Sequence, residues 1–92
     1  MIRAFVLYER EPERERYEQH VELCRRVPDS TFRHGRVFGA PVGEPQFRYY
    51  AEWEFPDRAA FDTAASSREF RQTGKDAMEM AIPFQVHFAE LA

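Results

Sequence analysis

His20 is the side chain in this sequence best placed to move a proton. Tyr17 and Cys24 flank it at helical spacing, so one helix face would carry all three toward a predicted sheet. An imidazole titrates near neutral pH and can exchange a proton with a phenol or a carbon acid. The position equally suits a core histidine that is hydrogen-bonded to a backbone carbonyl or a tyrosine. Both roles remain open.

Other chemistry has less support in the sequence. Cys24 as a nucleophile would need a base, and His20 one helical turn away is a formal partner, but a buried free cysteine commonly packs as a small hydrophobe. His20, His34 and His87 fall on three separate predicted elements without ligand spacing, so we expect no metal site. No glycine-rich loop follows a strand, and we expect no nucleotide or other cofactor.

Composition limits the class of protein. The 92 residues suit one domain, 1–92, and a hydrophobic share of 43% excludes a disordered chain. Thirteen basic and 16 acidic residues are interleaved, which does not predict nucleic-acid binding. No apolar run reaches the roughly 20 residues of a membrane span. The single cysteine, Cys24, and the charged residues directly after the short apolar stretch 2–8 predict a cytoplasmic protein without a signal peptide.

The elements that would position these side chains follow from periodicity. Strands are expected at 2–8, 31–39, 47–55 and 84–91. A first helix starts at Pro12 and ends before Pro28, and it buries Tyr17, His20, Val21, Cys24 and Val27. A second helix is split, with Asp57 capping its first part and a capping box of Ser66 and Glu69 restarting it. The order β-α-β-β-α-β predicts a ferredoxin-like α+β fold, in which a four-stranded antiparallel sheet has both helices on one face.

The hairpin between strands 31–39 and 47–55 determines which side chains share a face of the sheet. With Gly39 opposite Phe47, the face expected beneath the helices carries Gly35, Val37, Gly39, Tyr49, Ala51, Trp53 and Phe55. The face expected to lack helices mixes aromatic and charged side chains: Phe32, His34, Arg36, Tyr50, Glu52 and Glu54. Together with Phe38 this is a large apolar area for a small monomer, so we expect a second copy of the chain to cover it.

The sequence resembles the EthD-type proteins over nearly its whole length. The matching segments, in chain order, are 7–8, 20–23, 27–28, 36–39, 43–45, 50–55 with Asp57, and 65–69 followed by Asp76. The resemblance implies a dimeric α+β barrel, in which two ferredoxin-like sheets pair face to face. Wider relatives include cofactor-free monooxygenases, lactone isomerases and polyketide cyclases or dehydratases, which bind an aromatic or polyketide-like molecule between helices and sheet.

Two functions are therefore expected as alternatives. The first is a cofactor-free enzyme of the oxygenase, isomerase or dehydratase type, or a related binder, that holds a hydrophobic or aromatic metabolite between the first helix and the sheet. His20 would be its acid or base, and Tyr8, Tyr17, Tyr49 and Trp53 would contact the substrate, with Tyr8 donating a hydrogen bond. The second is a non-catalytic dimeric accessory or carrier protein in which these aromatics serve packing.

The polar side chains of the sheet have two possible roles as well. The cluster expected on the face without helices comprises Phe32, His34, Arg36, Tyr50, Glu52 and His87. It would line either a second pocket or an interface between two subunits.

Overall fold

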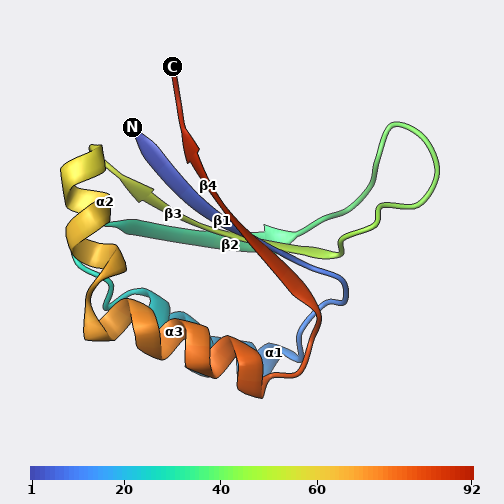
Figure 1. Cartoon of the computed structure of the whole chain (residues 1–92). Coiled ribbons are helices and arrows are strands. Elements are labelled where there is room, and N and C mark those ends of the chain that lie inside the picture. The colour runs from blue at the N-terminus through green and yellow to red at the C-terminus, as the bar shows by residue number, and fades with distance from the viewer.

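The computed structural model describes all residues, 1–92, as one sheet with helices on one side (Figure 1). The strands are β1 (Ile2–Tyr8), β2 (Thr31–Arg36), β3 (Tyr49–Phe55) and β4 (Phe84–Glu90). The helices are α1 (Arg14–Cys24), α2 (Arg58–Ala65) and α3 (Arg68–Glu79). None of the helices is long and apolar enough to cross a membrane.

The sheet has the order β2-β3-β1-β4, and all neighbouring strands are antiparallel. This topology confirms the predicted ferredoxin-like fold with a split second helix. Strand β1 lies inside the sheet, and its alternate side chains Ile2, Ala4, Val6 and Tyr8 are buried against the helices. The predicted stripe is confirmed for Tyr17, His20, Val21 and Cys24, which are all buried on α1, and Val27 is buried just beyond the end of this helix.

The two faces of the sheet differ in what covers them. We call the face that packs against the helices the covered face and the opposite one the open face. The alternation of β1 and the strand registers assign these residues to the open face: Arg3, Phe5, Leu7, Arg33, Gly35, Tyr50, Glu52, Glu54, Gln85 and His87.

The predicted register of the β2–β3 hairpin was wrong by one residue. Arg36 lies opposite Tyr49, and Phe32 lies opposite Trp53. The packing of Phe32 on Trp53, with ring centroids 5.1 Å apart, buries both aromatics beneath the helices, and this favours the observed register. Phe32, His34 and Arg36 therefore belong to the covered side of β2 and not to the face that we expected a second copy to cover.

The helix starts also differ from the sequence prediction. Helix α1 begins at Arg14, because the Glu13 carboxylate accepts hydrogen bonds from the next free backbone N–H groups, those of Glu15 and Arg16. Helix α3 is capped by Ser67, whose hydroxyl accepts from the Phe70 backbone N–H at 3.1 Å. Ser66, the predicted cap, instead ends α2.

The cap of α3 yields a test with a neighbouring control. Replacement Ser67→Ala removes the acceptor for the first turn of α3 and should lower the free energy of unfolding by about 1 kcal/mol. Ser66→Ala should change it by less than about 0.5 kcal/mol, since the Ser66 hydroxyl only donates to the Asp62 carbonyl of the preceding turn. Urea unfolding of the two variants measures this. A larger loss for Ser66→Ala than for Ser67→Ala would show that Ser66 caps the helix, as the predicted capping box requires.

Candidate functional site

An apolar cleft lies between α3 and the covered face of the sheet. Its volume is about 100 Å³, and its lining comprises Val6, Tyr8, Trp53, Phe70, Thr73, Gly74, Ala77, Phe84 and Val86. The cleft was expected beneath α1, and the structure places it beneath α3. Tyr8 and Trp53 belong to this lining, whereas Tyr17, Tyr49 and His20 do not.

Small residues on α3 create the space. Thr73, Gly74 and Ala77 all face the cleft, and a Cβ atom added at Gly74 would meet no atom within 4 Å. The opposite wall includes edge strand β4, where Val86 remains 42% exposed. The cleft therefore lies where the small residues of α3 face the edge of the sheet.

Aromatic rings fill the corresponding space beneath α1. The Tyr17 ring packs edge-on against Tyr8 and Tyr49, with centroids 5.7 and 5.1 Å away. It also contacts the rings of His20 and His34, each at 5.3 Å. Tyr17 thus belongs to the hydrophobic core, and the partly buried Tyr49 packs against it.

Polar groups in the cleft are few and mostly paired. The Thr73 hydroxyl donates to the Phe70 carbonyl at 2.6 Å, and the Trp53 indole N–H donates to the Cys24 carbonyl at 2.9 Å. The Tyr8 hydroxyl accepts a long hydrogen bond of 3.4 Å from Tyr17. Burial raises the pKa of Tyr8 to about 12, so this phenol keeps its proton at neutral pH.

His20 joins α1 to α3 through a carboxylate. Its Nδ1 lies 2.7 Å from Oδ2 of Asp76 on α3, and Arg16 donates to both oxygens of the same carboxylate at 2.7 and 3.2 Å. His20 is only 2% exposed. This arrangement suits a neutral imidazole that donates its Nδ1 proton to Asp76, leaving Nε2 as the ring nitrogen without a hydrogen bond in the chain.

The pKa directions in this cluster follow from burial and pairing. Burial lowers the pKa of His20 and outweighs the favourable effect of the Asp76 carboxylate. Burial also opposes ionisation of Asp76, but the hydrogen bonds from Arg16 and His20 hold the pKa of that carboxyl below its usual value. The cluster is thus a tether between two helices, and it lies outside the lining of the cleft.

Sequence reasoning singled out His20 without finding its partners. Asp76 was noted only as part of the resemblance, and Arg16 was missed, because the contacts join residues at least 56 positions apart. Cys24 is the last residue of α1, and burial raises the pKa of its thiol, which suits the role of a small hydrophobe. No group of three or more metal-ligating side chains comes together in the chain.

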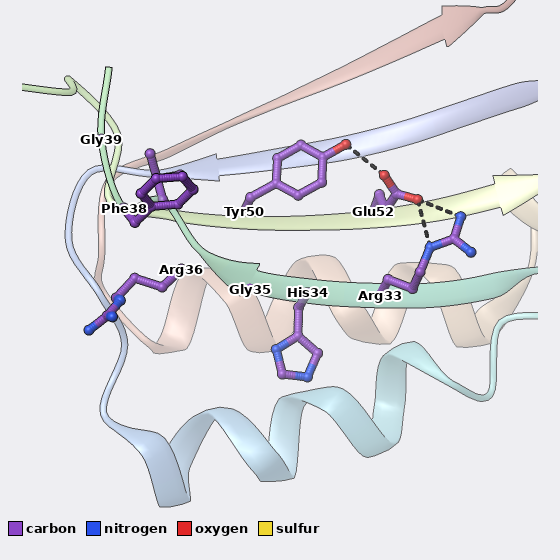
Figure 2. Close-up of a pocket in the computed structure, with 9 residues that line it drawn as sticks. Arg33, His34, Gly35, Arg36, Phe38, Gly39, Tyr50 and Glu52 are labelled. Carbon is purple, nitrogen blue, oxygen red and sulfur yellow. Dashed lines mark hydrogen bonds and ion pairs between the residues drawn. The ribbon is translucent and has the colours of Figure 1, made fainter. Parts of the chain in front are cut away.

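The open face carries a network of ion pairs. Arg33 donates to both Glu52 and Glu54, and Arg3 donates to Glu54 at 2.9 Å. The Tyr50 hydroxyl donates to Glu52 at 2.8 Å (Figure 2). Burial opposes ionisation of Glu52, which is 7% exposed, but its partners outweigh this and hold its pKa below the usual value. Arg3 and Arg33 were not predicted, since neither stood out by spacing.

The predicted polar cluster is divided between the two faces. Tyr50 and Glu52 lie on the open face, and Phe5 connects Tyr50 with His87, its ring centroid lying 6.2 Å from the first and 5.5 Å from the second. His34 points the other way, toward α1 (Figure 2), and its Nδ1 lies 2.6 Å from the Tyr49 hydroxyl. An open hollow of about 420 Å³ lies at the end of β2 beside Tyr50 and Phe38.

Comparisons with known proteins identify the fold. No protein-family model and no curated protein matches the sequence. An EthD family protein from Bacillus halodurans is similar in structure, with a TM-score of 0.81 and 24% identity over 100% of this chain and 99% of that one. A dimeric ferredoxin-like protein of unknown function from Jannaschia has a TM-score of 0.75 and 20% identity over 98% of both chains.

A third similar structure is a hydroxynitrile lyase from Passiflora edulis, with a TM-score of 0.75 and 17% identity over 99% of this chain and 93% of that one. At these identities the likeness establishes the fold. The chain therefore has the ferredoxin-like fold of an EthD family protein over its full length, as the resemblance in sequence implied.

The tether between α1 and α3 can be tested by one substitution. Asp76→Asn removes the charge that pairs with Arg16 and weakens the acceptor of His20, so the free energy of unfolding should fall by about 2 kcal/mol. Lys75→Gln, an exposed site on the same helix, is the matched control and should change it by less than about 0.5 kcal/mol. Equal losses in urea unfolding would contradict the tether.

Proposed function

We propose that the protein binds a small apolar molecule in the cleft beneath α3 and functions as a homodimer. The lining of the cleft supports the binding of an apolar molecule. Seven of its nine lining residues are hydrophobic, and it contains no charged side chain. Ligand pockets typically have such a lining, with a few polar groups that orient the ligand.

The size of the cleft limits the ligand. Its volume of about 100 Å³ is below the ~300 Å³ of typical drug-sized pockets. An apolar cavity of about 150 Å³ in another protein holds benzene. The cleft is smaller than that cavity, so one small ring would fill it and extend to its exposed edge at Val86. A charged molecule would lose its hydration without gaining an ionic partner.

Catalysis by His20 has less support than binding. A cofactor-free enzyme of the oxygenase, isomerase or dehydratase type is the more specific alternative, and one of the similar structures is that of a hydroxynitrile lyase. In this chain, however, His20 pairs with Asp76 and does not line the cleft. Binding without turnover, as in a carrier, is the function that the geometry supports best.

The open face supports the homodimer. Its aromatic side chains Phe5 and Tyr50 stack on one another, and no helix of the chain covers them. The neighbouring loop 37–48 extends beyond the sheet (Figure 1), where Phe38 is 94% exposed and Val42 90% exposed. The carboxylates beside them are already paired with arginines, so a second copy could cover this face without burying a lone charge. One of the similar proteins is described as dimeric.

A charge on the open face should separate the dimer. Phe5→Glu would place a carboxylate at the centre of the proposed interface, beside Glu52 on the neighbouring strand, and should give the monomer mass by light scattering at micromolar concentration. Met78→Glu introduces the same side chain at a residue that is 71% exposed on α3 and should leave the dimer intact. A wild-type protein at the monomer mass would refute the homodimer.

A larger side chain at position 74 should close the cleft. We expect toluene to shift the amide signals of α3 and β4 in an NMR titration of the wild-type protein. Gly74→Leu has free space in front of its Cβ position, so the fold should persist while toluene affinity falls at least tenfold. Lys75→Leu adds the same side chain one position along α3, outside the lining, and should bind toluene normally. Unchanged affinity in Gly74→Leu would contradict the cleft as the binding site.

A further inference from the structure

The hydrogen-bond inventory of the cleft leaves one donor unused. Thr73 and Trp53 donate their protons to backbone carbonyls. The hydroxyls of Tyr8 and Tyr17 share a single hydrogen bond, so one of their two protons has no acceptor in the chain. Tyr8 is 1% exposed, so bulk water does not offer a ready substitute.

Tyr8 is also the member of the tyrosine pair that reaches the cleft. The two hydroxyls share one hydrogen bond of 3.4 Å, longer than the ~2.8 Å usual between hydroxyls. Because this bond is weak, the O–H of Tyr8 can rotate toward a better acceptor. Tyr17 does not line the cleft. A buried donor without an acceptor is unfavourable, and a ligand with an acceptor would remove this penalty.

We propose that Tyr8 determines ligand specificity by donating a hydrogen bond to a single acceptor oxygen on the molecule in the cleft. The ligand class is then a small, neutral, mostly apolar molecule with one carbonyl oxygen, such as a cyclic or aromatic ketone or aldehyde. This inference rests on the proposed function of the cleft. It goes beyond that function because it names the group that the ligand must carry and the side chain that reads it.

The rest of the lining offers no second hydrogen-bond donor, so it suits a ligand with a single oxygen. Every other side chain that borders the cleft is a hydrocarbon or has its donor already in use. A second polar group on the ligand would therefore lose its hydration without gaining a donor. The raised pKa of Tyr8 means that the hydroxyl stays a donor throughout the neutral range.

Two ligands of the same shape test the proposal. Cyclohexanone carries the acceptor oxygen, and methylenecyclohexane replaces it with a CH₂ group. For each variant, NMR titration gives the ratio of the two dissociation constants, corrected for the water-to-hydrocarbon transfer of each ligand. This ratio should favour cyclohexanone in the wild-type protein by about fivefold to tenfold.

Three variants locate the donor. Tyr8→Phe removes only the hydroxyl and should abolish the preference, while the affinity for methylenecyclohexane stays within twofold. Tyr49→Phe is the matched control, since its hydroxyl pairs with His34 away from the cleft, and it should keep the preference. Tyr17→Phe removes the partner of Tyr8 without touching the lining and should keep the preference too.

A spectroscopic readout separates a hydrogen bond from a change in packing. The carbonyl stretch of bound cyclohexanone should lie at lower frequency in the wild-type protein than in Tyr8→Phe, as expected for a carbonyl that accepts a hydrogen bond. An unchanged stretch, or a preference that disappears in Tyr17→Phe and persists in Tyr8→Phe, would overturn the role of Tyr8.

The two proposals fail in different ways. If both ligands bind with no preference in the wild-type protein, the cleft is a binding site and the role of Tyr8 is refuted. If neither ligand shifts the signals of α3 and β4 at millimolar concentration, the proposed function itself fails, and the inference about Tyr8 is refuted with it.

Discussion

The indole of Trp53 contacts the sheet, α1 and α3 at the same time, and the arrangement of the molecule depends on these contacts. Its N–H donates to the Cys24 carbonyl at the end of α1. Its ring packs on Phe32 of β2 and, edge-on at 5.2 Å, on Phe70 of α3. One side chain therefore favours the register of the hairpin, satisfies a carbonyl that the helix leaves free and forms a wall of the cleft.

The two long helices pack on the sheet in different ways. Beneath α1 the rings of Tyr8, Tyr17 and Tyr49 fill the space, and the His20–Asp76 contact fastens this layer to α3. Beneath α3 the small residues Thr73, Gly74 and Ala77 leave a cleft between the helix and the sheet. The titratable residues thus gather where the core is dense, and the vacant volume lies where titratable groups are nearly absent. This separation is the physical reason for preferring binding to acid–base turnover.

Local patterns in the sequence were sufficient for the elements and the topology. The stripe of α1 and the alternation of β1 could be predicted because burial repeats at the helix and strand periods. The register of β2 could not, since the irregular loop 37–48 does not fix which residues of the hairpin face one another. The pairing of His20 with Asp76 and the position of the cleft depend on how α1 and α3 pack, which no local pattern encodes.

Gly74 gives the cleft a property that the fold itself does not require. Since its missing side chain leaves open space and the helix tolerates larger residues there, the depth of the cavity can be changed without moving the backbone. One substitution at position 74 could therefore change the size of the molecule that a protein of this fold binds, while the packing around Trp53 stays the same. The residue at position 74 would then set the size of the ligand that the cleft admits, independently of folding.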